Sequence, residues 1–303
     1  MPAFVKRIFF GTFFIVGLAS IALAGPEPMG DYSKGKNPIV EQTPVCDPHW
    51  YISLGGGIDV NLGSTEVTNG FDSNFDVLVP VFPGFAPARF EIDSRGWNDA
   101  FDDAWRIQGE IGRVLTPHLE IFGLFKYSQA DSSGNIDIGR MLFDVPPVIF
   151  PLSARFEDYS AWGGELGFRF FFLTKDACVR PYIALSGGAT HVDSIGATIT
   201  GDVRSVGGPE DFVIYHGAFF EDSWSATGAA ILGVEVRLAC HWSLGLEGGI
   251  RYENRLGQDD SDFKDFRFFD GVLALDLKEF RPINDDSGDR LFFPVNGYVK
   301  FRF

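Results

Sequence analysis

The chain has 303 residues and a formal net charge of −16, with 41 acidic against 25 basic side chains. Such an acidic chain repels nucleic-acid phosphates, so we exclude a nucleic-acid partner. It is 45% hydrophobic with 32 Phe and 36 Gly, yet residues 25–303 contain no apolar stretch of the roughly 20 residues that a transmembrane helix needs. Aromatic residues and Gly instead favour strands joined by tight turns.

The N-terminal region has the features of a secretion signal. Lys6 and Arg7 precede an apolar run at 8–23 that ends in Ala22-Leu23-Ala24. A basic start, a short apolar core and small residues at the exit are typical of a cleaved signal peptide rather than a membrane anchor. We predict that residues 1–24 are removed near Ala24. Residues 25–45, which are rich in Pro and Gly without periodicity, are predicted to form a flexible periplasmic leader.

From Trp50 onward, apolar and polar residues alternate in eight segments. Their approximate ranges are 50–62, 105–115, 119–127, 162–172, 181–193, 224–238, 242–253 and 291–303. Period-two alternation predicts strands with one apolar face. The connections are alternately long and short, as in a membrane barrel with short periplasmic turns and longer external loops. We therefore predict an all-β fold: one eight-stranded antiparallel transmembrane β-barrel over residues 46–303, with long external loops. Ten strands is the alternative, if residues 266–277 and a first-loop segment enter the wall.

The last segment shows the alternation most clearly. Its odd positions from Leu291 to Phe303 are apolar or Gly, and its even positions include Asn296, Lys300 and Arg302. This ending resembles the C-terminal signature of bacterial outer-membrane β-barrels. With the other segments, the chain resembles small barrels such as the OmpA transmembrane domain, the OmpX type and the opacity proteins. The resemblance implies a Gram-negative outer membrane with its lipid and lipopolysaccharide. It also implies recognition of Phe301 and Phe303 by the barrel-assembly machinery.

Turning the polar faces inward predicts a charged bore. Seven acids and seven bases would face it: Asp59, Glu110, Glu120, Glu165, Glu235, Glu247 and Glu253, with Arg106, Lys126, Arg169, Arg237, Arg251, Lys300 and Arg302. An eight-stranded barrel is wide enough only for its own side chains. We therefore favour a salt-bridge network that plugs the lumen, because buried charges need partners. The alternative is a narrow porin-like channel lined by the same charges.

If the bore is neutral, the external loops carry the negative charge. Such loops repel the phosphates of lipopolysaccharide unless divalent cations bridge them. A Phe-acid-Asp triplet recurs at 101–103, 156–158 and 220–222, each time shortly before a Trp, and we interpret it as hairpin duplication. The triplets and residues 259–262 are candidate Ca²⁺ or Mg²⁺ contacts. Solvated acidic loops are favoured, because the spacing matches no calcium loop, and we predict no metal site and no cofactor.

Residues 77–85 and 143–152 in the first two loops are apolar and Pro-rich. Exposed apolar patches usually mark partners, so one interpretation is a recognition surface. The other is that strands continue above the membrane and pack on each other. The residues leave both interpretations open.

Three cysteines are present, namely Cys46, Cys178 and Cys240. Cys178 starts the fifth predicted strand and Cys240 ends the sixth, which places both at the periplasmic rim. A disulfide between them is a candidate in an oxidising compartment, with Cys46 as a competing partner. Metal binding is less favoured, because only His241 lies nearby in the sequence.

Two histidines, one at the outer end of a predicted strand and one in the loop beyond it, raise the question of an enzyme. The lipid A deacylase and palmitoyl-transferase barrels use a Ser and a His near the outer leaflet. Here His191 and Ser194 stand close in the sequence and His216 lies in the next loop, but the deacylase His-x-Ser pattern is missing. We expect no catalysis. The prediction is a non-enzymatic outer-membrane protein whose acidic loops serve an extracellular ligand or envelope integrity.

Overall fold

The computed structural model describes residues 49–62, 66–68, 71–78, 85–144, 147–202, 204, 212–258, 267–268, 273–274 and 289–303. All of them belong to one compact unit, Pro48–Phe303. The predicted signal peptide, the leader, Cys46 and the acidic run 259–262 lie outside these residues. Among the residues described, no helix is long and apolar enough to cross a membrane.

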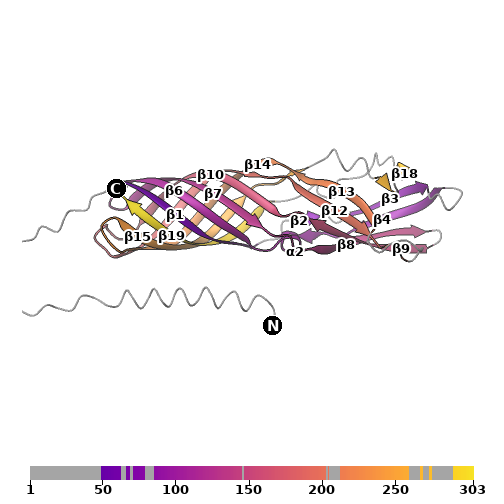
Figure 1. Ribbon diagram of the computed structural model, residues 1–303, viewed down its shortest axis with the longest axis horizontal. Helices are drawn as coiled ribbons and strands as arrows, with labels where there is room; N and C mark the ends of the chain where they lie inside the picture. The colour runs from indigo at the N-terminus through magenta and orange to yellow at the C-terminus, as the bar shows by residue number, and fades with distance from the viewer. Residues whose placement is uncertain are drawn as a thin grey trace, which may run out of the picture. The chain divides into compact units, whose positions relative to one another are not determined.

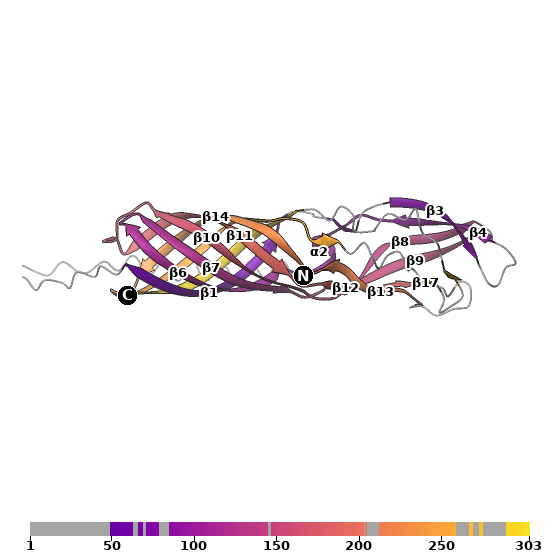
Figure 2. The ribbon, with the colours of Figure 1, turned by 90° about the horizontal axis from the view of Figure 1, so that it is seen from above.

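Eight strands close into an antiparallel barrel (Figures 1 and 2). They are β1 (Trp50–Asn61), β6 (Ala104–Thr116), β7 (Leu119–Ala130), β10 (Tyr159–Phe171), β11 (Val179–Val192), β14 (Ser223–Arg237), β15 (Trp242–Glu253) and β19 (Arg290–Arg302). Each pairs with its neighbour in this order, and β19 pairs back onto β1. The predicted eight-stranded barrel is confirmed.

The ten-strand alternative is wrong. Strands β17 (Arg267–Phe268) and β18 (Leu273–Ala274), from the segment that was a candidate for the wall, form a separate two-stranded sheet. The first-loop strands β3 (Phe71–Leu78) and β4 (Phe85–Ile92) join a second, larger sheet. The eight-stranded wall is closed without any of them.

The barrel wall presents apolar side chains outward and charged ones inward. On β10, Leu166 is 76% exposed, whereas the adjacent Glu165 is 2% exposed. Ile107, Phe125 and Leu232 repeat the outward pattern on other strands. This arrangement reverses that of a water-soluble protein. It suits a wall surrounded by hydrocarbon, with every strand edge paired, so the barrel is built to span a membrane.

Aromatic side chains gather at both ends of the barrel exterior. Tyr127, Trp162, His191 and Trp224 lie side by side in one cross-strand row, because Trp162 pairs with Tyr127 and His191, and His191 pairs with Trp224. At the other end, Phe172 follows Trp162 after ten residues. With a rise of about 3.3 Å per residue and a tilt of about 40°, that separation is about 25 Å. It matches the height of the apolar band of such barrels.

A seven-stranded sheet continues the hairpins beyond the barrel, away from the C-terminus (Figures 1 and 2). Besides β3 and β4 it contains β8 (Asn135–Asp144), β9 (Pro147–Phe156), β12 (Ile195–Gly201), β13 (Phe212–Glu221) and β16 (Gly257–Gln258). Near the barrel mouth lie β2 (Glu66–Thr68), β5 (Arg95–Gly96) and the short helix α2 (Trp97–Ala100). We call these elements the outer extension.

The outer extension has an apolar core, whereas the barrel interior combines buried charges with a smaller apolar cluster that includes Phe122 and Leu124. Phe150 and Leu152 of β9 are 6% and 1% exposed, so the part of the apolar stretch 143–152 that lies on β9 turns these side chains inward. This confirms continuing strands rather than a purely exposed patch for that stretch. Segments 131–158 and 194–222, which we expected to be long loops, are largely β8 with β9 and β12 with β13. Alternation at Ile195, Ala197 and Ile199 buries the inner face of β12.

The repeated Phe-acid-Asp triplets have a packing role. Phe101, Phe156 and Phe220 are each at most 2% exposed and belong to the outer core. The rings of Phe101 and Phe156 are 5.9 Å apart. The acidic residues that follow lie where the chain passes between the outer extension and the barrel. Each triplet therefore buries an aromatic ring above the barrel and leaves its acids at the junction.

Candidate functional site

The bore contains a first ion-pair cluster near the short turns. Arg169 of β10 donates both terminal guanidinium nitrogens to the two carboxylate oxygens of Glu110 on β6, at 2.9 and 3.0 Å. One of these nitrogens is also 3.4 Å from Glu120 on β7. The guanidinium lies over three aromatic rings, those of Phe122, Tyr182 and Tyr298. Arg169 thus bridges strands across the lumen while fully surrounded by side chains.

The same cluster extends through Glu235 on β14. Its carboxylate accepts from Arg302, lies 2.8 Å from the Lys300 ammonium and 3.7 Å from the Arg180 guanidinium. Lys300 also reaches Glu120 at 2.9 Å. Every member of this group is at most 4% exposed. Two carboxylates are therefore shared among three cations, which crosslinks β7, β11, β14 and β19.

Midway along the bore, Glu247 of β15 is surrounded by neutral donors. It accepts hydrogen bonds from Tyr182 at 2.8 Å, Gln108 at 3.1 Å and Asn296 at 3.4 Å. These groups come from β11, β6 and β19, so the network again crosses the lumen rather than following one wall. Buried carboxylates need this number of donors, because each oxygen offers more than one acceptor site.

A second charged cluster occupies the half of the bore that faces the outer extension. Lys126 is 2.7 Å from Glu253 and 3.2 Å from Glu165. Each of these acids has a second cation: Arg290 is 3.3 Å from Glu253, and Arg251 is 3.4 Å from Glu165. Lys126 thus links β7, β10 and β15 at one point.

Arg106 and Asp59 form a separate pair in this half, at 3.0 Å between β6 and β1. Both residues are at most 5% exposed. The pair links β6 to β1, the strand that pairs with β19 and closes the barrel.

Above this cluster, the bore meets the apolar core. The Arg290 guanidinium lies 5.3 Å from the ring centroids of both Trp97 and Tyr159. Trp97, on α2, is 2% exposed, and its ring packs against Phe101 at 4.3 Å. The Tyr159 hydroxyl donates to Glu253 at 3.5 Å. Aromatic side chains therefore cover the charged lumen at this end.

The structure places all predicted bore residues in buried positions except one. Arg237, at the end of β14, is only half-buried, because the barrel opens to solvent beside the turns. Arg180 and Arg290, which stand one residue before the fifth and eighth predicted strands, are 3% and 0% exposed and make the ion pairs described above. Tyr51, Tyr182 and Tyr298 also line the bore. The signal that marks Arg290 is its even position in the alternation of β19.

The candidate disulfide between Cys178 and Cys240 is wrong. Cys178 is an exposed free thiol, whereas Cys240 is disulfide-bonded. Cys46, the competing partner in the sequence analysis, lies outside the described residues. The two rim cysteines belong to different turns: Cys178 accepts a backbone hydrogen bond from Arg237, and Cys240 stands in the turn between β14 and β15.

His191 lies on the outside of the barrel and does not contact Ser194. Its ring stacks on Trp162 at 5.2 Å and meets Trp224 edge-on at 5.1 Å. Its two nitrogens face the carboxylates of Asp193 and Asp222, at 3.5 and 3.6 Å. The Asp193 carboxylate also accepts a hydrogen bond from the Ser160 hydroxyl. The ring of His216 is instead hydrogen-bonded to the hydroxyl of Thr198 on β12, at 2.9 Å. A Ser–His contact for acyl transfer is not formed by these groups.

The acids of the outer extension are mostly exposed, as in Asp102, Glu157 and Glu221. Hydrogen bonds from Arg204 hold the pKa of the Asp202 carboxyl below its usual range, and Glu91 and Asp93 also have arginine partners. Among the residues that the structure describes, no group of three or more His, Cys, Asp or Glu side chains is arranged to hold a metal ion. In the triplets, the exposed acids are Asp102, Glu157, Asp158, Glu221 and Asp222.

No protein-family model matches the sequence, and no curated protein matches it. Several solved structures are similar in fold at low identity. Neisserial surface protein A (NspA) is 10% identical with a TM-score of 0.34, over 84% of this chain and 97% of its own. Ail, the attachment invasion locus protein of Yersinia pestis, is 10% identical with a TM-score of 0.35, over 85% and 99%. The outer membrane protease OmpT from Escherichia coli is 10% identical with a TM-score of 0.33, over 84% and 97%.

Proposed function

We propose that this protein is an integral outer-membrane barrel that does not conduct solutes and that displays a folded, acidic β-extension to the outside of the cell. The observation that carries the proposal is the filled bore. Fifteen charged side chains of the barrel strands are buried, and ion pairs or hydrogen bonds join them across the lumen. A barrel so closed serves as an anchor, and the outer extension is the part that meets a partner.

Electrostatics supports a plug over a pore. An ion passing the bore would have to displace pairs such as Arg169–Glu110, which has two parallel hydrogen bonds. Removing one partner of a buried pair costs about 3–5 kcal/mol, so opening several at once is strongly unfavourable. The aromatic cover of Trp97 and Tyr159 adds an apolar barrier at one end.

Planar-bilayer recording tests the plug. We expect the refolded protein to give no current steps above those of protein-free bilayers. The double variant Arg169→Ala with Lys300→Ala deletes two side chains that reach across the bore near the short turns. It is expected to produce small current steps. Steps from the unchanged protein whose ion selectivity shifts in Arg169→Ala would instead support the narrow channel.

Location is tested separately in cells. The chain should fractionate with the outer membrane after loss of its first 24 residues, and protease added to intact cells should cut the outer extension but spare the barrel. Recovery in the inner membrane, or full protection of the outer extension until the envelope is broken, would reject surface display.

We also propose that the protein is not an enzyme. The support is the arrangement around His191, whose two ring nitrogens face carboxylates. Expression should leave the mass of lipid A unchanged. A mass change that disappears in His191→Ala would overturn this proposal.

A further inference from the structure

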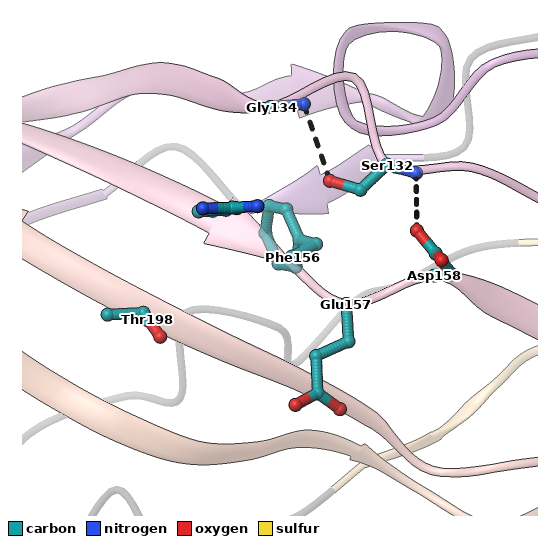
Figure 3. Close-up of a pocket in the computed structure, with 7 residues that line it drawn as sticks. Ser132, Gly134, Phe156, Glu157, Asp158 and Thr198 are labelled. Carbon is teal, nitrogen blue, oxygen red and sulfur yellow. Dashed lines mark hydrogen bonds between the residues drawn. The ribbon is translucent and has the colours of Figure 1, made fainter.

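A hollow of about 460 Å³ opens on the outer extension, beside the junction with the barrel (Figure 3). It is lined by Ser132, Gly134, Arg155, Phe156, Glu157, Asp158 and Thr198. These residues come from β9, from β12, and from the connections before β8 and after β9. The volume is within the range of small-ligand sites, roughly 300–1,000 Å³.

The walls of the hollow are fixed by the fold. Phe156 is anchored in the apolar core at 2% exposure, and the Asp158 carboxylate accepts a hydrogen bond from the Ser132 backbone N–H at 2.9 Å (Figure 3). Arg155 is directly opposite Thr198 on the neighbouring strand. Polar groups held on strands and core-anchored turns give a ligand a preorganised surface, which reduces the entropy lost on binding.

Gly196 leaves the space in which the Glu157 carboxylate lies. A side-chain carbon at Gly196 would come within 2.6 Å of that carboxyl carbon. The backbone N–H of Glu157 donates to the Gly196 carbonyl at 2.9 Å, which fixes the two strands at this point. In Figure 3 the Glu157 carboxylate points away from Asp158, so the two acids present separate oxygens.

Two charged groups of the hollow have no ion-pair partner in the part of the chain that is described. These are the exposed side chains of Arg155 and Glu157. The hollow therefore combines a guanidinium that only donates, carboxylates that only accept, and hydroxyls from Ser132 and Thr198 that do both. A ligand that matches this set must both donate and accept over a short distance.

We propose that this hollow binds a short neutral saccharide. Adjacent hydroxyl groups of a sugar can donate to the Glu157 carboxylate while other sugar oxygens accept from Arg155. Two carboxylates against one guanidinium leave the hollow negative, which disfavours phosphorylated, sulfated or sialylated sugars. The inference deepens the proposed function by naming the class of ligand that the displayed surface takes.

The test uses the refolded chain in detergent micelles and is independent of membrane location and conductance. Saturation-transfer NMR with maltotriose, lactose and N,N′-diacetylchitobiose as neutral probes is expected to show transfer to at least one of them. Sulfated lactose should show none. The dissociation constant of the bound probe is then measured by titration in the variants.

Glu157→Gln removes the acceptor charge, and Gly196→Val pushes the carboxylate out of its place. Each is expected to weaken binding about tenfold or more, because a hydrogen bond to a charged group is worth about 1.5–3 kcal/mol. The matched control is Glu221→Gln, an exposed acid at the equivalent junction of β13 with β14, which should leave affinity within about twofold. An unchanged melting temperature shows that a variant is folded.

Three results would overturn the saccharide site. They are no transfer from any neutral probe, stronger transfer from sulfated lactose, and binding that Glu157→Gln and Gly196→Val leave intact. The saccharide test can fail while the bilayer recording shows no current steps and protease cuts the outer extension on intact cells. That combination would reject the saccharide site and retain the proposed function as an anchored, surface-displayed protein.

Discussion

The barrel and the outer extension are made by the same hairpins but have opposite polarity. In the barrel, Leu166 faces outward and Glu165 inward, whereas in the outer extension Phe150 and Leu152 face inward. Where the chain re-enters the barrel at β6, β10 and β14, it changes from one pattern to the other at the Phe-acid-Asp triplets. The difference shows that a strand's alternation fixes only that its two faces differ, and that the surrounding solvent decides which face is turned inward.

The largest effect is expected from breaking the barrel interior. Glu235→Ala leaves Lys300, Arg302 and Arg180 without a carboxylate that they share, and should lower the free energy of unfolding by about 3–5 kcal/mol. Unfolding by guanidinium chloride in detergent micelles measures this free energy. Glu221→Ala, an exposed acid in the outer extension, is the control and should change stability by about 0.5 kcal/mol or less. Equal effects of the two variants would mean that the bore charges are solvated.

Phe156→Ala should cost a similar amount, about 3–5 kcal/mol, but only in the outer extension. Its ring is buried among others, including Phe219 at 5.0 Å. Limited proteolysis should cut β8, β9 and β12 faster than in the unchanged protein while the barrel stays intact, because local units can open separately. Phe168→Ala, on the lipid-facing wall, should leave the outer extension cut no faster than in the unchanged protein. Loss of the barrel together with the outer extension would contradict separate cores.

A charge placed on the exterior of the barrel and one placed on the exterior of the outer extension should differ clearly in their cost to stability. Leu166→Arg puts a cation on the lipid side of β10 and is expected to cost about 2–4 kcal/mol in bilayers. Val213→Arg, at a position 51% exposed on β13, should cost about 0.5 kcal/mol or less, since water surrounds it. The free energies of unfolding of the two variants in liposomes are compared with that of the unchanged protein. Similar costs would mean that the barrel exterior and the outer extension are surrounded by the same solvent.

Much of the barrel could be predicted from the sequence. Each wall strand is long enough to show several apolar–polar alternations, and β19 alternates over its whole length. Whether a residue number is odd or even therefore predicts whether its side chain faces the bore. Arg290 escaped because it stands one residue before the predicted strand. The burial of Arg237 was overestimated, because the last inward-facing position of β14 lies beside open solvent. Parity gives the face of a residue, and the depth within the barrel decides its burial.

The outer extension was harder to predict for a different reason. Alternation in β12 was present, but the strand is short and follows a barrel strand after only Asp193 and Ser194, so the segment was interpreted as a loop. The pairing of Cys240 depends on three-dimensional distance, which residue spacing does not contain. The hollow beside Gly196 likewise depends on the pairing of β9 with β12. Long-range pairings of this kind carry no local sequence signal.

A smaller effect is expected at the aromatic row. His191→Ala removes a ring that contacts both Trp162 and Trp224 and should cost about 1 kcal/mol, the usual contribution of an aromatic pair. Tryptophan fluorescence should shift with it. His216→Ala, on the outer extension, is the control and should leave the emission spectrum unchanged. An unchanged spectrum in His191→Ala would contradict the stacked arrangement.

The central claim is that lipid surrounds the barrel and water surrounds the outer extension. Spin labels attached to cysteines at Leu166 and Val213, each in a Cys178→Ser background in liposomes, test it through collisions with oxygen and with a water-soluble nickel complex. We predict that the label at 166 meets oxygen and excludes nickel, and that the label at 213 shows the reverse. Equal nickel access at both positions would contradict the claim.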